Sequence, residues 1–328
     1  MVRFVFSVED LALTRFAISP MWELVRSVLA LRDPSHAALH LPWLRSLSGR
    51  LQGLALERIA ALNPPRGYTP DFLVPLPSGP LGDIDDDLAA LRSTPIAHIR
   101  ADMALFASQH KRGADIAAPY LASPRREVQR LGDVLEAYWG RALEPVWPRI
   151  SAILEADITY RARRLTTGGP AALFADLHPN VTWKQPYLDV QVPGHDATFS
   201  LDGRGLLLVP SAFTTRPVVS DRAPWLAGVI YPARGIANLW EQAPVAPGGL
   251  ARLIGHSRAT ILADLEAPRS TTELAERLSL SPATTSHHLT ALRAAGLVTS
   301  RRDGRSVLYA RTPVGDALAT HPPNGFSP

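Results

Sequence analysis

The spacing of hydrophobic positions changes twice along the chain. At the start, Val2, Phe4 and Phe6 recur at every second position, which predicts a strand over residues 1–7. Apolar residues then recur every three to four positions, which predicts helices over residues 22–31, 51–62, 95–110, 124–141 and 145–165. From Val181 the period returns to about two, which predicts strands within residues 181–192, 197–211 and 223–232. The fold class expected is α+β, mostly helical with a small antiparallel sheet.

Capping and turn residues mark the ends of several predicted elements. Ser7 and Asp10 form an acidic variant of the capping box at a helix start. Thr94 is the expected N-cap of the helix that begins at Pro95. The dipeptide Asp202-Gly203 predicts a β hairpin between the strands on either side of it.

The residues after Pro247 follow a different pattern, in which three helices precede two strands. The predicted elements are a helix over residues 250–265, a helix capped by Ser270, a helix capped by Ser281 with Pro282 at its first position, and two strands around the turn Asp303-Gly304. This order of helix, helix-turn-helix and hairpin predicts a winged helix-turn-helix.

Composition changes at the same place and indicates a domain boundary. Residues 248–328 hold nine arginines against six acidic residues, and their only aromatic residues are Tyr309 and Phe326. Pro and Gly residues between 241 and 249 are typical of a linker. The expected domains are an N-terminal dimerisation or effector domain over 1–243, a linker over 244–249, a winged helix-turn-helix over 250–320 and a tail over 321–328.

The helix after Ser281 has the outward face that DNA recognition requires. A helix in a major groove about 12 Å wide needs small polar side chains outside, and arginines at a hairpin tip can contact phosphates or the minor groove. The expected DNA-binding residues are Ser281, Ala283, Thr284, Ser286, His287, Thr290, Arg301, Arg302 and Arg305. A winged helix that contacts only protein is the alternative.

The segment STTELAERLSLSPATTSHHLTALRAAGLVTSRRDGRSVLYART resembles the DNA-binding core of the ArsR-type bacterial repressors. The resemblance covers roughly residues 250–320 and implies that Ser286 and His287 contact bases and that Arg305 is the wing arginine. The upstream segments PSAF (210–213) and YPARGIANLW (231–240) resemble an uncharacterised domain that precedes such wings in regulators of high-GC bacteria. That second resemblance implies architecture and no activity.

Metal sensing is not expected, because the residues that would hold a metal are missing. The chain has no cysteine, and residues 273–277 stand where metal-sensing relatives carry a Cys-x-Cys pair. His36 and His40 have helical spacing but lack the Glu of the zinc-protease motif. The acidic run from Asp83 to Asp87 lacks the Gly and Glu of a calcium loop and favours a helix start at Leu88.

No motif for catalysis or for a cofactor rises above background in this sequence. The Gly-x-Ser-x-Gly and P-loop patterns are absent, and Gly203-Arg204-Gly205 lacks the third glycine of a dinucleotide fingerprint. We therefore expect no enzyme and no cofactor. Five tryptophans of the body could line a ligand pocket, pack in the core or form a dimer surface: Trp139, Trp147, Trp183, Trp225 and Trp240.

The sequence thus predicts a cytoplasmic transcriptional regulator of the ArsR type that binds double-stranded operator DNA as a homodimer. Repression is expected from the resemblance alone, and a small-molecule effector in the N-terminal domain would release the DNA. The longest wholly apolar stretch, residues 206–209, is far too short to span a membrane. The rival hypothesis is an enzyme in the N-terminal domain with the winged helix as a targeting appendage. A third hypothesis is a dimer-forming scaffold that binds no ligand.

Overall fold

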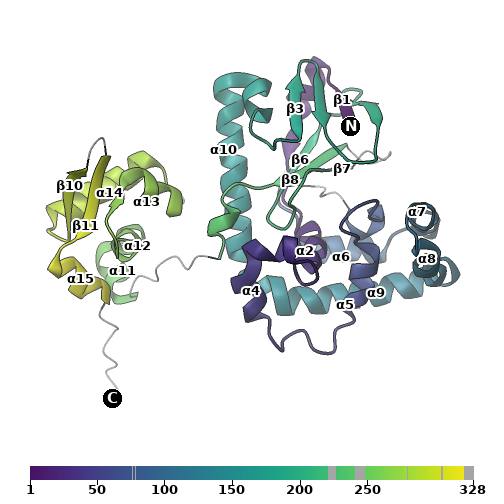
Figure 1. Ribbon diagram of the computed structural model, residues 1–328, viewed down its shortest axis with the longest axis horizontal. Helices are drawn as coiled ribbons and strands as arrows, with labels where there is room; N and C mark the ends of the chain where they lie inside the picture. Colours follow the sequence, from purple (N-terminus) through teal and green to yellow (C-terminus); the bar gives the residue numbers. More distant parts are fainter. Residues whose placement is uncertain are drawn as a thin grey trace. The chain divides into compact units, whose positions relative to one another are not determined.

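The computed structural model describes residues 1–75, 77, 79–220, 227–240, 248–278, 280–303 and 306–320. Internal contacts divide the chain into two compact units, Met1–Leu239 and Trp240–Pro328. We call them the N-terminal and C-terminal units. Each is treated by itself below (Figure 1).

The N-terminal unit holds helices and two small sheets. Its α-helices are α1 (Val8–Leu13), α2 (Pro20–Ala30), α3 (Pro34–Ala37), α4 (Leu41–Ser46), α5 (Leu56–Leu62), α6 (Ile84–Arg92), α7 (Ile96–Gln109), α8 (Gly113–Ala122), α9 (Pro124–Tyr138) and α10 (Trp147–Phe174). Its strands are β1 (Val2–Val5), β2 (Arg15–Phe16), β3 (Val181–Lys184), β4 (Tyr187–Val190), β5 (Ala197–Ser200), β6 (Leu207–Ser211), β7 (Val218–Ser220) and β8 (Gly228–Pro232). Short helical turns are η1 (Ala38–His40), η2 (Asp71–Leu73), η3 (Trp139–Leu143), η4 (Glu144–Val146) and η5 (Ile236–Asn238).

Both sheets of this unit are mixed, which corrects the predicted small antiparallel sheet. The first sheet has the order β3-β4-β1-β5, and β1 pairs antiparallel with β4 but parallel with β5. The second has the order β2-β6-β8-β7, in which β2, β6 and β8 are parallel and β7 is antiparallel to β8. Strands that are distant in sequence therefore lie side by side, as β1 and β5 do.

The predicted hairpin at Asp202-Gly203 is also wrong, because β5 and β6 belong to different sheets. Asp202, Gly203 and Gly205 all have positive φ angles, so this segment does make a tight turn. The turn carries the chain from one sheet to the other instead of back along β5. Gly205 is required there, since a Cβ atom would lie 2.4 Å from the backbone oxygen of Leu13.

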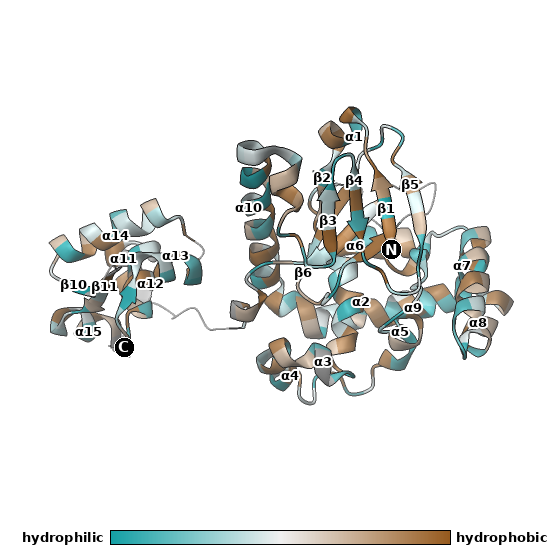
Figure 2. Ribbon diagram, turned by 45° about the horizontal axis from the view of Figure 1, so that its top comes forward, coloured by the Kyte–Doolittle hydropathy of each residue, from teal (hydrophilic) through white to brown (hydrophobic). Residues whose placement is uncertain are grey.

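Strand β6 is the centre of the layered arrangement because both of its faces are buried. Leu208 packs into a cluster with Phe4 and Leu188 of the first sheet, and Phe174 of α10 joins the same cluster. The alternate residues Leu207 and Val209 pack with Trp22 of α2. The second sheet therefore lies between the first sheet and a helical layer. Helix α10, which carries hydrophobic and hydrophilic stretches (Figure 2), contacts both β3 and β6.

Helix α2 forms the middle of the helical layer, and all of its eleven residues are buried. Its Glu23 accepts hydrogen bonds through Oε2 from the backbone N–H groups of Ala212 (2.9 Å) and Phe213 (3.2 Å), where the chain leaves β6. The indole N–H of Trp22 donates to the Thr214 hydroxyl at 2.8 Å. These bonds attach the helix directly to the second sheet. The two segments noted upstream of the wing, 210–213 and 231–240, thus begin at the ends of β6 and β8.

Several predicted helix limits need correction. Helix α5 begins at Leu56 instead of residue 51, after glycines with positive φ at 49 and 53. Pro95, and not Thr94, occupies the N-cap position of α7, and the Thr94 hydroxyl donates to the Ala90 carbonyl. Asp83 caps α6 through the N–H groups of Asp85 and Asp86, so the helix begins at Ile84 and not at Leu88. The capping box of Ser7 and Asp10 is formed as predicted.

The C-terminal unit is a bundle of short helices with a three-stranded sheet. Its elements are α11 (Gly248–Ile254), α12 (His256–Asp264), β9 (Arg269–Ser270), α13 (Thr271–Arg277), α14 (Pro282–Ala294), β10 (Val298–Asp303), β11 (Ser306–Arg311) and α15 (Pro313–Thr320). The helix predicted over 250–265 is two helices, which are separated at Gly255 (φ 86°). Helix α11 already begins at Gly248, inside the predicted linker, and residues 241–247 and the predicted tail lie outside the described residues.

The core of this unit is built from leucines on α12, α13 and α14. Leu262, Leu274, Leu289 and Leu292 are buried in one cluster. Arg311 of β11 donates to the backbone oxygens of Leu262 and Ala263 and lies 3.5 Å from Asp316, so it fixes the hairpin to the end of α12. Asp264 is buried and forms ion pairs with Arg269 and Arg277.

The buried carboxyl group of Glu23 predicts a pH dependence of stability. Burial raises its pKa from 4.5 to about 7, against the hydrogen bonds that lower it. Since the folded protein holds this proton more tightly than the unfolded chain, the contribution to stability is complete below about pH 4.5 and is lost as the pH rises through 7. Glu23→Gln keeps an acceptor oxygen for both N–H groups. We expect the wild type to lose up to about 3 kcal/mol relative to Glu23→Gln between pH 5 and 8.

The measurement is urea unfolding followed by tryptophan fluorescence, because six of the seven tryptophans lie in the N-terminal unit. The pKa of Asp87 is raised to about 6 and that of His40 is lowered to about 4, in both cases mainly by burial. The difference between wild type and variant at each pH removes these common contributions. Parallel pH profiles for the two proteins would contradict the assignment to Glu23.

Candidate nucleic-acid interface

Local capping residues fix the position at which helix α14 begins. The Ser281 hydroxyl accepts a hydrogen bond from the N–H of Thr284 at 3.0 Å, and Pro282 stands at the first position of the helix. Helix α13 begins in the same way, with a complete capping box between Ser270 and Glu273. The N-terminal ends of α13 and α14 are therefore both fixed by local caps.

The two faces of α14 differ as the sequence predicted for a recognition helix. Thr285, Leu289 and Leu292 are buried against the rest of the unit. The exposed residues include all those expected to meet DNA on this helix: Ala283, Thr284, Ser286, His287 and Thr290. The hydroxyl of Thr290 donates to the Ser286 carbonyl at 2.9 Å, and its oxygen remains able to accept a hydrogen bond. The exposed face is small and polar.

His288 is half-buried and differs from its exposed neighbour His287. Its Nδ1 atom is buried without a hydrogen-bond partner. Burial lowers the pKa of His288, and Arg258 and His287 lower it further. The ring thus lies near enough to Arg258 of α12 for that charge to affect its pKa. The two adjacent histidines do not act as a pair toward one ligand.

The hairpin β10–β11 follows α14 and places its arginines on opposite faces. Residue 302 pairs with Val307 and residue 301 with Leu308, and successive residues of a strand point to opposite sides. Arg302 shares its face with Ser300, whose hydroxyl accepts a hydrogen bond from Arg293 of α14. Arg301 lies on the other face. Both arginines are exposed, and Arg305 lies outside the described residues.

The arginines of this unit fall into two groups, those with hydrogen-bond or ion-pair partners that hold the fold and those whose guanidinium groups face solvent. Arg258, Arg269, Arg277 and Arg311 are bound to backbone carbonyls or acidic side chains within the described part of the unit. The other described arginine side chains are exposed and lack a carboxylate partner among the described residues: Arg293, Arg301 and Arg302. Arg293 was not predicted as a site residue. Its signal was present in the sequence, since it stands three positions after Thr290 on the same side of the helix.

The comparison with protein families agrees with this geometry. Residues 256–301 match a family model that is described as a helix-turn-helix domain. The match runs from the start of α12 into β10 and includes α13 and α14. A helix-turn-helix domain indicates a DNA-binding regulator. The comparisons with curated proteins and with solved structures give no match.

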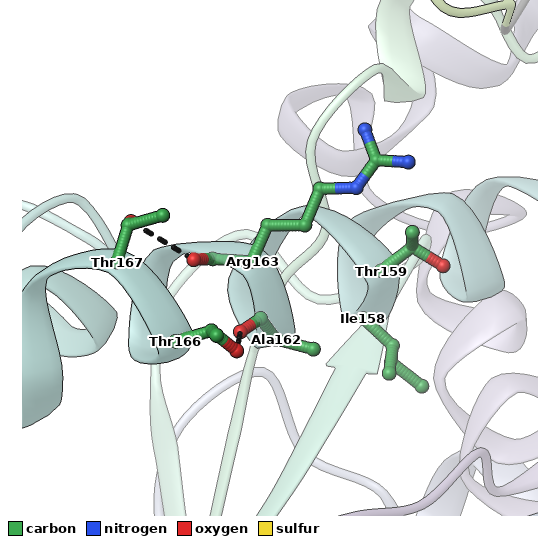
Figure 3. A pocket seen from close by; sticks show the side chains of 6 residues that line it. All are labelled: Ile158, Thr159, Ala162, Arg163, Thr166 and Thr167. Carbon is green, nitrogen blue, oxygen red and sulfur yellow. Dashed lines mark hydrogen bonds between the residues drawn. The ribbon is translucent and has the colours of Figure 1, made fainter.

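A shallow hollow lies along α10 of the N-terminal unit and is lined by Ile158, Thr159, Ala162, Arg163, Thr166 and Thr167 (Figure 3). The hydroxyls of Thr166 and Thr167 donate to carbonyls of their own helix, those of Ala162 and Arg163. Only the Arg163 guanidinium projects from this surface without a described partner. The hollow therefore lacks convergent polar groups of the kind that orient a ligand.

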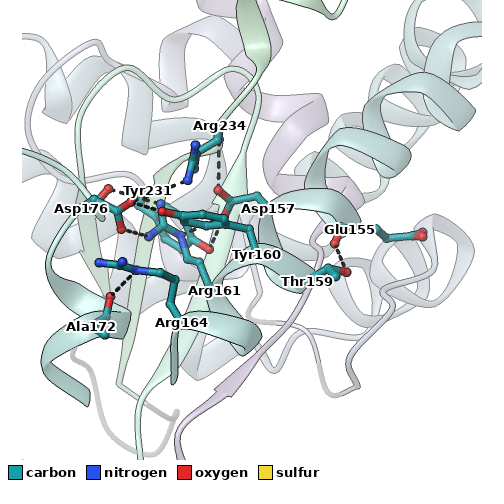
Figure 4. Close-up of polar contacts among 10 residues, drawn as sticks. All are labelled: Glu155, Asp157, Thr159, Tyr160, Arg161, Arg164, Ala172, Asp176, Tyr231 and Arg234. Atoms are coloured by element: carbon teal, nitrogen blue, oxygen red, sulfur yellow. Dashed lines mark hydrogen bonds and ion pairs between the residues drawn. The ribbon is translucent and has the colours of Figure 1, made fainter. Parts of the chain in front are cut away.

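A buried ionic network attaches α10 to the end of β8 (Figure 4). Asp157 accepts hydrogen bonds from Arg161 (3.0 Å), from the hydroxyl of Tyr231 (2.7 Å) and from the N–H of Arg234 (3.1 Å). Arg161 also binds Asp176 at 3.1 Å, and Tyr160 donates to the same carboxylate at 2.6 Å. Because the groups are bound to one another, this cluster joins α10 to the chain that leaves β8.

The described residues contain no group of three or more histidine, aspartate or glutamate side chains arranged to hold a metal ion. His40 is buried with its ring stacked 4.3 Å from that of Phe213, while His36 lies 3.3 Å from Asp33. The charge of His36 adds to the lowering of the pKa of His40, so the two side chains lie near one another, each with different partners. Among the described helices, none combines the length and the apolar character that crossing a membrane requires.

The cap of α14 gives a test that separates its structural role from a role in DNA contact. Ser281→Ala removes the acceptor for Thr284, and we expect α14 to lose about 1 kcal/mol of protection. Ser281→Asp keeps a good N-cap but adds a negative charge beside the exposed face. We expect Asp to preserve protection and to weaken DNA binding. Hydrogen-exchange mass spectrometry of peptides from 281–294, with DNA titration, measures both effects. Equal protection in Ser281→Ala and wild type would contradict the capping role.

Proposed function

We propose that this protein is a transcriptional repressor of the ArsR type that binds operator DNA through the C-terminal unit. The observation that carries the proposal is the exposed polar face of α14 beside unpaired arginines on the following hairpin. In this proposal α14 enters the major groove, and the hairpin acts as the wing that contacts phosphates. The ArsR-type assignment draws its support from the resemblance of the segment from Ser270 to Thr312.

Binding takes place as a homodimer on a palindromic operator in this proposal. Two copies of α14 would address half-sites about 34 Å apart, one turn of the double helix. The N-terminal unit would hold the dimer, receive a signal, or do both. A signal changes DNA binding only if the effector has different affinities for the competent and incompetent states.

The proposal assigns no catalytic step to the N-terminal unit. A cluster of ionisable groups around Asp157 and Arg161 is occupied by internal hydrogen bonds. Such saturation supports a structural role, because a catalytic acid or base needs a free position toward its substrate. That the protein is a regulator without a cofactor stays an expectation from the sequence.

The decisive experiment is a fluorescence-anisotropy titration of the full chain with DNA from its own promoter and with scrambled DNA. Measurements at about 50 and 200 mM salt separate the phosphate contribution from sequence recognition. A steep salt dependence with at least about a hundredfold preference for the promoter supports the proposal. Equal, weak binding to both DNAs contradicts specific recognition.

His287 tests direct base contact. His287→Ala should weaken binding to the operator by about 1–3 kcal/mol and change binding to scrambled DNA much less, because base contacts carry the sequence preference. The matched control is His98→Ala on the exposed surface of α7. An equal loss on operator and scrambled DNA would place His287 among the phosphate contacts.

The two described wing arginines test the face of the hairpin that meets DNA. Arg302→Gln should reduce the slope of log K against log salt by about 0.9, the contribution of one phosphate contact. Arg301→Gln should have a smaller effect, since Arg301 lies on the face opposite Ser300 and Arg293. Arg66→Gln, an exposed arginine of the N-terminal unit, is the charge-matched control. Reversal of the order of Arg301 and Arg302 would contradict this arrangement.

A further inference from the structure

A cavity of about 350 Å³ opens between the C-terminal ends of α2 and α5 in the N-terminal unit. Its lining residues are Leu29, Arg32, Asp33, Ala60, Asn63 and Pro65. Leu29, Ala60 and Pro65 give it an apolar wall, and the other three give it polar groups. The volume is at the lower end of the range for small-molecule sites.

The polar floor of the cavity is Asn63, which is 1% exposed and leads directly to a buried arginine. The Asn63 Oδ1 atom accepts a hydrogen bond from Nη1 of Arg26 at 2.8 Å, and its Nδ2 donates to the Val25 carbonyl at 2.6 Å. The guanidinium of Arg26 therefore lies immediately behind the amide that lines the cavity. Burial lowers the pKa of Arg26 to about 10, so the group remains charged at pH 7.

Arg26 is incompletely satisfied in its buried position. Its Nε atom has no hydrogen-bond partner, and neither has the Oε1 atom of Glu23 one turn earlier on α2. The two side chains form no ion pair among the described contacts, although each affects the pKa of the other. Native proteins rarely leave a buried polar atom without a hydrogen-bond partner, and a water molecule or a bound anion is one explanation for such an atom.

The mouth of the cavity carries a second cation. Arg32 is exposed, and its guanidinium has no partner among the described residues. The carboxylate of Asp33 is adjacent, but it lies 3.3 Å from Nδ1 of His36 and is engaged there. The cavity thus combines one arginine at the mouth, one behind the floor and an apolar wall between them. A ligand that fits these groups carries an anionic acceptor on a small apolar body.

We propose that this cavity binds a small organic carboxylate, with Arg32 at the mouth and Asn63 at the floor, where Arg26 lies directly behind the Asn63 amide. In the proposed regulator this cavity would be the site that receives the signal. That regulatory role rests on the proposed function, whereas binding of a carboxylate in the cavity does not. Because Glu23 and Arg26 lie on the same helix, and Glu23 holds the chain after β6, an occupant at Arg26 acts on the helix that joins the helical layer to the second sheet.

The test uses the full chain without DNA and sodium benzoate as the probe. Benzamide, which has the same shape and no charge, is the ligand control, and sodium chloride keeps the ionic strength constant. We expect a saturable rise in the melting temperature with benzoate up to about 20 mM and none with benzamide. Isothermal titration should give a Kd at least about tenfold weaker in Arg32→Gln and unchanged in Arg66→Gln.

A second variant tests the floor of the site. Asn63→Asp places a carboxylate beside Arg26 without a change in size, so it should abolish benzoate binding. Hexanoate serves as a second probe, a carboxylate with an aliphatic body. The proposal is overturned if neither benzoate nor hexanoate gives saturable binding to the wild type. Equal benzoate affinity in the wild type and Arg32→Gln also overturns it. A negative result with benzoate does not contradict operator binding. A negative result with operator DNA, in turn, does not contradict benzoate binding in this cavity.

Discussion

The hydrogen bonds from Glu23 to the chain that leaves β6 are the constraint on which the N-terminal unit depends. A helix buried on every side and a strand buried on both faces normally join through apolar contacts alone. Here a carboxyl group also reaches across and accepts the N–H groups of Ala212 and Phe213. These two backbone N–H groups lie beyond the end of β6 and would otherwise be buried without hydrogen-bond partners. Strand β6 in turn shares its other face with the first sheet, so the two sheets and the helical layer meet around this point.

The C-terminal unit shows how partners, and not residue type, reveal the role of an arginine. The chain uses arginine for nearly all of its basic positions, so composition alone says little about nucleic acid. Arg311 is committed to the carbonyls at the end of α12, and Asp264 takes up Arg269 and Arg277. Their charges hold the fold together. Arg293, Arg301 and Arg302 lie on the outside without carboxylate partners, which is the state in which a guanidinium can release counterions from DNA phosphates.

The sequence predicted the features that local chemistry decides and missed those that depend on distant partners. Ser270, Ser281 and Pro282 mark their helices because a cap acts within three residues. Asp202-Gly203 did predict a turn, but the parallel pairing of β5 with β1 is decided by packing between segments nearly two hundred positions apart. Burial of Asn63 and Arg26 has no sequence signal either, since each looks like an ordinary surface residue until α2 is enclosed.

The unpaired atoms of Glu23 and Arg26 and those of the hairpin arginines lie in opposite environments, and this difference has a physical consequence. An exposed arginine on the hairpin is well hydrated, so the absence of a partner costs little free energy. Salt weakens the contact that such an arginine makes with a DNA phosphate. The unpaired atoms of Glu23 and Arg26 are buried, so a missing partner costs more free energy there than at the surface. A small change in proton or ligand occupancy therefore has a larger effect at the buried pair than on the surface.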